Sequence, residues 1–214
     1  MKLKRLAIMG SGGLAREVEW LVRDLNRVTP TWEFVGYVVS DLSRLGEYDS
    51  KAQVRGDYQS LRDGVDAVAI GIGTPASRLK VAAEVKALYP ALEWPVLVHP
   101  SARIDFDSAT LGPGAIVAAG VIATVNLVLG AHAFVNLACT IGHEATIGEG
   151  CVVNPSVNLS GGVKLGAGVL VGTGAQVLQY LEVGAGATIG AGAVVTKNVE
   201  AGTTVVGMPA RPRS

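Results

Sequence analysis

The chain has 214 residues, with 18 Lys and Arg against 18 Asp and Glu, so its formal net charge at pH 7 is zero. This balance provides no basic field for nucleic acid or an anionic membrane surface and argues against both partners. Apolar residues make up 49% of the chain and aromatic residues only 5%, while 28 residues are glycine. Such a composition is typical of small aliphatic side chains packed in a narrow core.

The N-terminal residues MKLKRLAIMGSGG are basic, but only four apolar residues run together before the glycines. That run is too short for the core of a signal peptide. The sequence also lacks the run of about 18 uncharged apolar residues that a membrane-spanning helix needs. Cys139 and Cys151 follow no metal or disulfide spacing. We therefore expect a cytoplasmic protein with no metal site.

Strand and helix patterns alternate along the first part of the chain. Short apolar runs predict strands at residues 5–9, 34–39, 66–72 and 94–98. Amphipathic spacing predicts helices over residues 16–25 and 77–89, the second of which is stopped by Pro90. Alternating strands and helices indicate a parallel sheet with crossover helices. We predict a small Rossmann-like α/β domain over residues 1–98.

The first predicted strand is followed by GSGGLA, residues 10–15, which matches G-x-G-x-x-G/A between a strand and a helix. Backbone N–H groups at such a helix N-terminus bind phosphate. The residues expected to hold a pyrophosphate are Gly10, Ser11, Gly12 and Gly13. A tight turn without a ligand is the alternative.

A second loop follows the third predicted strand. This loop, GIGT, contains Gly73, and Arg78 lies on the helix after it. Both residues could complete the pocket that GSGGLA begins. Arg78 is either a phosphate ligand or a solvated helix residue, and the sequence does not distinguish these two roles.

The pattern changes after residue 110. From Leu111 to Val195 every sixth residue is aliphatic, and a small or medium apolar residue follows four positions after each. A six-residue unit is one short strand plus a bend, and three units close a triangular coil in which residues 18 apart stack. We predict a parallel β-helix over residues 99–214. Cys139 and Cys151 fall in the second apolar lane, so we expect them in its core.

One unit, IGHEATIGEG at residues 141–150, interrupts the repeat with reactive side chains. His143 and Glu144 stand at a bend, where side chains point outward. Glu144 can accept a hydrogen bond from one ring nitrogen and so fix the tautomer. One coil later stands Gly161, whose missing side chain leaves space for a ligand and whose N–H can approach a carbonyl oxygen. A surface histidine without a function is the alternative.

Five segments occur in the order in which a known family has them: GSGGLA (10–15), HPSA (99–102), NLACTIGHEATIGEG (136–150), LSGGVKLG (159–166) and VVGMPAR (205–211). Over essentially its whole length the chain resembles the hexapeptide-repeat acyltransferases. Within them it is most similar to the sialic-acid O-acetyltransferase-like proteins and the bacterial UDP-4-amino-sugar N-acetyltransferases of glycan biosynthesis. The resemblance implies a left-handed β-helix, acetyl-CoA as co-substrate and a homotrimer.

The resemblance also implies roles for individual residues. His143 matches the general base of the family, Glu144 lies beside it, and Asn136 matches a position near the acceptor. Small residues of later coils match the seat of the coenzyme: Gly161, Thr173 and Ala191.

Two positions depart from the family pattern. Some members carry a second histidine nine residues after the base, where this chain has Val152. Relatives that bind UDP-sugars typically have two aspartates after the second strand. Here Val39 and Ser40 stand in their place, and Asp41 comes one residue late. We keep Ser40 among the candidate substrate-binding residues, while uridine recognition stays open.

These patterns predict an acetyl-CoA-dependent acetyltransferase that acts on an amino or hydroxyl group of a sugar, UDP-linked according to the resemblance. A histidine base lets the acceptor attack the thioester directly in a ternary complex, without an acyl-enzyme. One alternative is a nucleotide- or NAD-dependent oxidoreductase that uses GSGGLA, although no domain with a hydride-transfer site accompanies it. The other is a non-catalytic trimeric scaffold, against which His143 and Glu144 argue.

Overall fold

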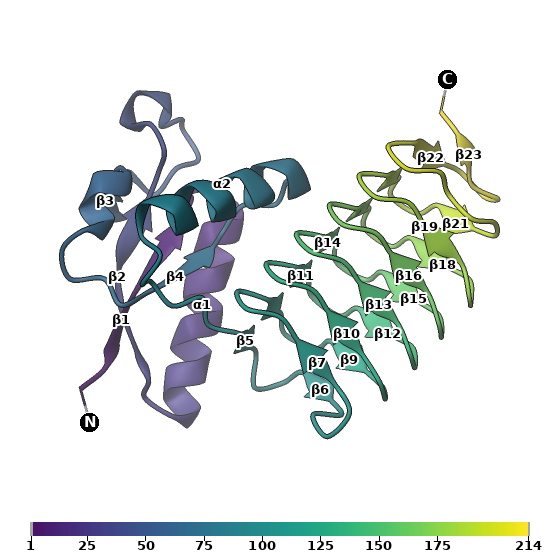
Figure 1. Cartoon of the computed structure of the whole chain (residues 1–214), viewed down its shortest axis with the longest axis horizontal. Coiled ribbons are helices and arrows are strands. Elements are labelled where there is room, and N and C mark those ends of the chain that lie inside the picture. Colours follow the sequence, from purple (N-terminus) through teal and green to yellow (C-terminus); the bar gives the residue numbers. More distant parts are fainter. Residues whose placement is uncertain (1, 214) are drawn as a thin grey trace.

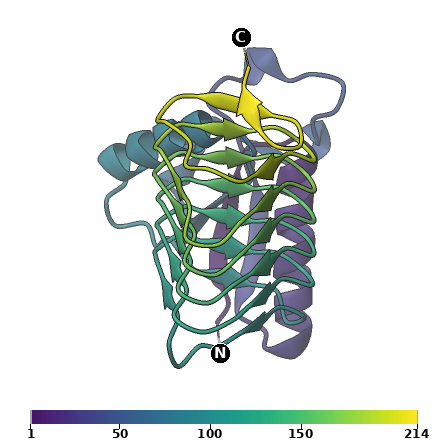
Figure 2. The same ribbon diagram turned by 90° about the vertical axis from the view of Figure 1, so that its right-hand side faces the viewer.

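The computed structural model describes residues 2–213. A small sheet with two long helices, purple to teal in Figure 1, lies beside a stack of coils, and the chain ends on the far coil. Figure 2 looks at the stack from its C-terminal end, with the helices behind and beside the coils. Neither α-helix within residues 2–213 has the length and hydropathy that a membrane crossing requires.

Sheet A, in the N-terminal unit, has four parallel strands in the order β3-β2-β1-β4. Its strands are β1 (Lys4–Met9), β2 (Trp32–Val38), β3 (Val54–Gly56) and β4 (Ala67–Ile70). The helices are α1 (Gly13–Val28), α2 (Pro75–Leu88) and the short 3-10 helices η1 (Leu42–Arg44), η2 (Lys51–Gln53) and η3 (Tyr58–Leu61). The first three predicted strands and both predicted helices are therefore confirmed, whereas β3 was not predicted because three residues carry too little pattern.

The predicted strand at 94–98 is wrong in its placement. Leu97–Val98 form β5, which pairs with β8 of the coils rather than with sheet A. The preceding segment meets sheet A at Glu93, which forms an isolated bridge with Ala67 and a salt bridge with Lys4 of β1. Leu97 is fully buried in a core that α1 shares with the coils. The coils therefore begin at residue 97, inside the range predicted for the first domain.

Three sheets form the walls of a prism, and all their strand pairs are parallel except the one that joins β23. Sheet B comprises β5, β8 (Ile116–Val117), β11 (Phe134–Val135), β14 (Val152–Val153), β17 (Leu170–Val171), β20 (Thr188–Ile189), β22 (Thr204–Val206) and β23 (Arg211–Pro212). Sheet C comprises β6 (Arg103–Ile104), β9 (Ile122–Ala123), β12 (Thr140–Ile141), β15 (Asn158–Leu159), β18 (Gln176–Val177) and β21 (Val194–Val195). Sheet D comprises β7 (Thr110–Leu111), β10 (Val128–Leu129), β13 (Thr146–Ile147), β16 (Lys164–Leu165) and β19 (Glu182–Val183).

The pairing register follows the predicted period, since Thr140 pairs with Asn158, which is 18 residues later. The two apolar lanes form one continuous core inside the prism. Cys139 and Cys151 are fully buried in this core, as predicted. Burial raises the pKa of each thiol to about 11, so both are inert structural residues.

Three corners run along the prism, and each is named after the two sheets that it joins. Corner BC comprises residues 118–121, 136–139, 154–157, 172–175 and 190–193. Corner CD comprises residues 124–127, 142–145, 160–163, 178–181 and 196–199. Corner DB comprises residues 112–115, 130–133, 148–151, 166–169 and 184–187.

The N-terminal unit covers sheet B. Apolar residues of α1, including Val18 and Leu21, pack against the outward side chains of sheet B, including Phe134 and Val152. Helix α2 reaches corner DB, where the Arg78 side chain donates a hydrogen bond to the His132 carbonyl group. Corner CD, which joins the other two sheets, is the corner of the prism opposite to sheet B.

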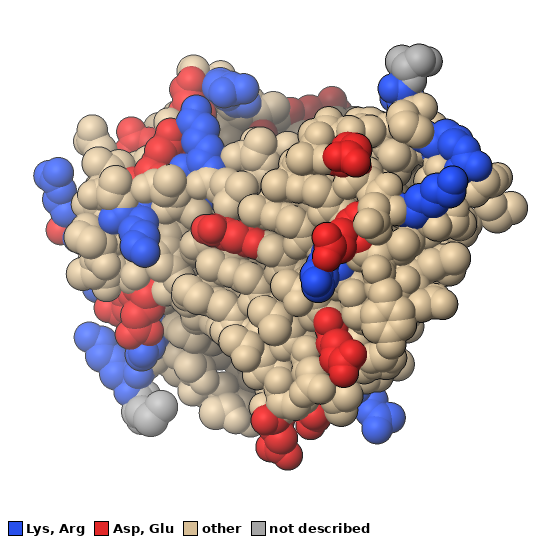
Figure 3. All heavy atoms as spheres, turned by 45° about the vertical axis from the view of Figure 1, so that its right-hand side comes forward, with Lys and Arg blue, Asp and Glu red and all other residues tan. Residues whose placement is uncertain are grey.

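Charged side chains are sparse over the coils, as Figure 3 shows. Between residues 108 and 196 the charged residues are Glu144, Glu149, Lys164 and Glu182. Lys164 and Glu182 pair across sheet D at 3.0 Å. An anionic residue at corner CD, Glu144, therefore stands on an otherwise nearly uncharged surface.

Candidate active site

His143 follows β12 at corner CD, where the bend turns its side chain outward as predicted. Half of the side chain is exposed, and Nδ1 lies 3.4 Å from Oε2 of Glu144. Glu144 has φ 60, in the left-handed region that lets the chain turn sharply here. The carboxylate thus faces one ring nitrogen at ion-pair distance, which leaves Nε2 as the nitrogen that can exchange a proton with a substrate.

Gly161 lies directly against this imidazole. A Cβ atom at Gly161 would collide with Nε2 and Cε1 of His143, so only glycine leaves the ring its place. The expected free space above Gly161 is therefore occupied by the His143 ring rather than left for a ligand. Within residues 2–213, the Gly161 N–H donates to no backbone carbonyl group, and its nitrogen lies against Gly142 of the preceding coil.

Corner BC holds the other residues predicted around the reaction. Asn136 is nearly buried there, and its Oδ1 accepts a hydrogen bond from the Leu137 N–H at 2.7 Å. Thr173 and Ala191 are exposed on later turns of the same corner. Because corners BC and CD lie at opposite ends of β12, one chain does not bring these three residues to His143.

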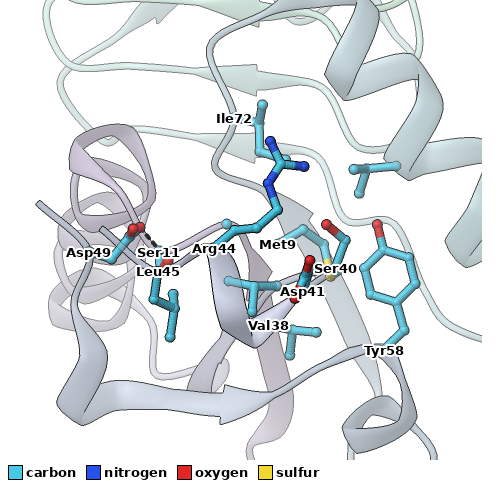
Figure 4. Close-up of a pocket in the computed structure, with 13 residues that line it drawn as sticks. Met9, Ser11, Val38, Ser40, Asp41, Arg44, Leu45, Asp49, Tyr58 and Ile72 are labelled. Atoms are coloured by element: carbon cyan, nitrogen blue, oxygen red, sulfur yellow. Dashed lines mark hydrogen bonds between the residues drawn. The ribbon is translucent and has the colours of Figure 1, made fainter. Parts of the chain in front are cut away.

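A pocket of about 250 Å³ opens at the carboxyl ends of β1 and β2 (Figure 4). Three predicted substrate-binding residues line it: Gly10, Ser11 and Ser40. The other predicted glycines, Gly12, Gly13 and Gly73, lie outside its lining. The remaining lining residues are Met9, Val38, Val39, Asp41, Arg44, Leu45, Asp49, Tyr58, Ile72 and Val81.

Two carboxylates of this pocket are held by local hydrogen bonds. Asp49 Oδ1 accepts from the Ser11 hydroxyl group at 2.6 Å, and Oδ2 accepts from the Gly46 N–H at 2.7 Å. The bond from Ser11 is the main reason that the pKa of Asp49 is lowered. Asp41 caps η1 through the N–H and hydroxyl groups of Ser43, which lower its pKa in turn. Both carboxyl groups therefore stay ionised at the rim of the pocket.

Comparison with known proteins gave matches among solved structures. The acetyltransferase domain of PglB from Neisseria gonorrhoeae FA1090 is 30% identical, with 98% of this chain and 100% of that chain covered and a TM-score of 0.85. PerB from Caulobacter crescentus, in complex with CoA and GDP-perosamine, is 27% identical, with coverage of 100% and 99% and a TM-score of 0.84. WeeI from Acinetobacter baumannii AYE, at 24% identity, coverage of 98% and 100% and a TM-score of 0.82, shows the fold alone.

The chain belongs to the hexapeptide-repeat acyltransferases. No family model and no curated sequence matches it, so the relationship rests on whole-chain structural similarity. Membership favours acyl transfer over the oxidoreductase and the scaffold. The three sheets of this acyltransferase fit a left-handed β-helix. The Rossmann-like classification of the N-terminal unit stays a prediction.

Arg78 of this acyltransferase is not available to a phosphate group. It is fully buried, Nη1 donates to the carbonyl groups of Ile70 and Ile72, and Nε donates to that of His132. Burial lowers the pKa of its guanidinium to about 9. We therefore correct its assignment from a candidate substrate ligand to a residue that joins α2 to corner DB.

The other two histidines are structural. The His132 ring is 7% exposed and packs edge-on against Trp94 at 4.6 Å between centroids. Burial lowers the pKa of His132 to about 4. Nε2 of His99 lies 3.1 Å from Asp24 of α1 and Nδ1 lies 2.8 Å from the Ser101 hydroxyl group, so His99 fixes the junction between the two units.

Several residues of the two regions were not predicted from the sequence. Arg44, Asp49 and Tyr58 enter the pocket from a segment with little strand or helix pattern, so nothing indicated that it folds back. The position of Val152, where some relatives have a second histidine, is buried against the N-terminal unit. Tyr180 at corner CD was also missed, although an aromatic residue at a bend position was a visible signal.

Proposed function

We propose that this acyltransferase transfers the acetyl group of acetyl-CoA to the amino group of a nucleotide-linked sugar. The observation that carries the proposal is His143, exposed at corner CD against Gly161 with Glu144 beside it. The PglB domain was solved in complex with acetyl coenzyme A, and PerB with CoA and GDP-perosamine. An amino acceptor is favoured over a hydroxyl acceptor because the perosamine enzyme is named an N-acetyltransferase.

In the proposed reaction, His143 acts as the general base. The acceptor nitrogen attacks the thioester carbonyl carbon, a C–N bond forms, and Nε2 takes the proton that the nitrogen loses. The C–S bond then breaks, and the CoA thiolate leaves with a proton from the imidazolium. In this proposal the Gly161 N–H, which has no backbone partner within residues 2–213, donates a hydrogen bond to the oxyanion between these two events. Glu144 supports the positive charge that the ring carries in between.

The nucleotide part of the acceptor belongs, in this proposal, in the pocket at the ends of β1 and β2. Gly10, Ser11 and Ser40 provide polar contacts, and Arg44 takes the phosphate role that Arg78 does not fill. Figure 4 shows the Arg44 side chain extended across this pocket. The base stays open, since we expected uridine and PerB was solved with a guanosine nucleotide.

A homotrimer would complete the site. Within one chain the N-terminal unit covers sheet B, whereas His143 lies at the corner opposite to it. The predicted coenzyme residues are also divided, with Gly161 at corner CD and Thr173 and Ala191 at corner BC. We propose that corner BC of one chain meets corner CD of the next, so that each cleft holds both sets.

The test is thiol release from acetyl-CoA with UDP-, GDP- and dTDP-linked amino sugars, followed by mass analysis of the sugar product. Each amino sugar is paired with the analogue that carries a hydroxyl group at the same carbon. We expect release with at least one amino sugar, little with its analogue, and release slower by about two to four orders of magnitude with His143→Asn. Release that is independent of any sugar, or equal in the His143→Asn variant, would contradict the proposal.

A further inference from the structure

Tyr180 adopts a backbone conformation that its side chain disfavours. Its φ is 58, whereas the equivalent positions on other turns of corner CD hold Asn126, Glu144 and Gly162. A bulky residue in the left-handed region is a strained outlier, and glycine or asparagine is the usual occupant. Tyr180 is 67% exposed, so packing in the core of the prism does not offset this strain. The same φ recurs at corner positions along the prism, for example at Asn126, Ala138 and Ser156, so the fold imposes the backbone conformation and Tyr180 is unusual only in its bulky side chain.

Two rings converge on the turn that holds Gly161 and Gly162. The His143 ring reaches forward from the preceding coil and lies over Gly161. The Tyr180 ring reaches back from the following coil and lies over Gly162, where a Cβ atom would collide with Cδ1 of the tyrosine. The Tyr180 N–H also donates to the Gly161 carbonyl group at 2.9 Å, which anchors the turn. Gly161 and Gly162 thus form one flat surface, called the floor below, and each ring covers one of the two glycines.

The distance between the two rings makes Tyr180 a close neighbour of the proposed base. A nucleophile lies about 3 Å from the nitrogen that accepts its proton. The carbonyl carbon under attack lies about 3 Å further on. The ring centroids of His143 and Tyr180 are 6.4 Å apart. An acyl group that lies over this turn on the side of the later coils is therefore within reach of the Tyr180 ring.

The chemistry of corner CD beyond His143 suits the acyl donor better than a sugar. The exposed side chains of the later coils are Leu178 and Tyr180 with the polar Gln179 between them, and then the cationic Lys197. Lys197 stands three coils after His143, which is roughly 14 Å at the usual strand spacing. Lys197 and Arg211, together with the anionic Glu200, line a pocket of about 390 Å³ at that end. Leu178 and Tyr180 suit a thioester arm, and the two cations suit the phosphates at its end.

We propose that Tyr180 contacts the acyl group of the donor and limits it to acetyl. The inference rests on the proposed function and adds the residue that sets the size of the acyl group. With His143 over Gly161 and Tyr180 over Gly162, no uncovered floor remains beside the base for a longer chain. Loss of the phenol ring uncovers Gly162 and opens a groove next to the imidazole.

The experiment compares the wild-type protein with Tyr180→Gly, using acetyl-, butanoyl- and hexanoyl-CoA and the sugar found in the acceptor panel. The ratio of kcat/KM for butanoyl-CoA to that for acetyl-CoA should rise at least about tenfold in the variant, as a hydrophobic pocket discriminates by that much per added group. The KM for acetyl-CoA should rise about threefold to tenfold with the lost ring contact, while the KM for the sugar stays the same. The Tm should equal or exceed that of the wild type, because glycine adopts φ 58 without strain.

Two controls isolate the ring. Ser156→Gly relieves the same kind of backbone conformation, φ 59, at corner BC and should leave the acyl preference unchanged. Tyr180→Phe keeps the ring and should keep the preference for acetyl-CoA. An unchanged preference in a folded Tyr180→Gly, or a wild type that uses butanoyl-CoA as well as acetyl-CoA, overturns the inference. No thiol release by the wild type with any acyl-CoA refutes the proposed function itself, and the inference falls with it.

Discussion

Corners DB and CD each carry one histidine of the same six-residue repeat. The ring at corner DB is buried, whereas the ring at corner CD is half exposed. His132 is covered by Trp94 and by the segment that Arg78 reaches, and its Nδ1 is buried without a hydrogen-bond partner among the described residues. His143 is half exposed, lies against Gly161 and has a carboxylate 3.4 Å away. The repeat thus turns both side chains outward, but the element that covers the corner decides their chemistry.

The difference supports corner CD as the reactive corner of the proposed function. Desolvation beside the Arg78 cation keeps His132 neutral, with its pKa lowered to about 4, so it does not exchange protons near neutral pH. At corner CD no helix of the N-terminal unit intervenes, and solvent and substrate reach the ring. A general base needs this access as much as it needs a suitable ring.

The comparison is tested most strongly by the same substitution at both corners. His143→Asn should lower the acetylation rate by about two to four orders of magnitude, the range for loss of a general base. His132→Asn should stay within a few-fold of the wild type, because its ring contacts no reacting group. Steady-state rates on matched, folded preparations provide the measurement, and equal losses at the two corners would refute the contrast.

Substitutions at corner DB, which the N-terminal unit covers, should affect the free energy of unfolding rather than the reaction rate. Arg78→Ala leaves the carbonyl groups of Ile70, Ile72 and His132 without their donor and should lower the free energy of unfolding by about 2–4 kcal/mol. Urea unfolding measures this loss. Arg78→Met, which restores volume without donors, separates packing from hydrogen bonding. A change below about 0.5 kcal/mol for Arg78→Ala, the range of ordinary surface substitutions, would argue that the domain contact is not held by this residue.

Corner CD should also depend on a neighbouring chain. We expect His143→Asn and Thr173→Trp chains to be nearly inactive alone. When they are unfolded together and reassembled in equal amounts, about a quarter of the interfaces should pair an intact corner CD with an intact corner BC and so recover activity. Activity of the mixture no higher than that of either variant would place both corners in the same chain's site, or in none.

The smallest expected effect concerns pH. The folded pKa of His132, about 4, lies below its ordinary value of 6.5, so the unfolded state binds more protons between these two pH values. The stability that the neutral ring supports is complete above pH 6.5 and is lost as the pH falls toward 4. Between pH 7 and pH 5.5 this amounts to about 1 kcal/mol, and Tm measured across that range should fall less in His132→Asn than in the wild type. Parallel pH profiles for the two proteins would contradict this assignment.

The coils were predictable because every coil repeats the same spacing of apolar residues. Both apolar lanes, the 18-residue register and the outward position of His143 follow from spacing alone. What the spacing does not contain is contact between distant segments. Three contacts are of this kind: Arg78 with the His132 carbonyl group, β5 with β8, and Ser11 with Asp49. In each, the local sequence of one partner does not indicate the other.

The site shows the same limit. His143 and Glu144 were found because they interrupt a monotonous repeat, and Gly161 because it stacks one coil later. The convergence of His143 and Tyr180 over two glycines depends on which way each ring leans from its bend, and the repeat does not encode that direction. Local sequence therefore locates the proposed site at corner CD, and side-chain geometry defines its shape.

The stacking of coils of equal length fixes the distances between positions along the prism. Each complete turn adds 18 residues and one strand spacing, about 4.8 Å, to every wall at once. Inserting a whole turn between Val183 and Val195 would move the Lys197 end away from the imidazole by one fixed step without disturbing either end. The distance between His143 and Lys197 therefore changes only in steps of one strand spacing. Adding or removing whole turns would fit the prism to an acyl donor of different length without a change of its surface.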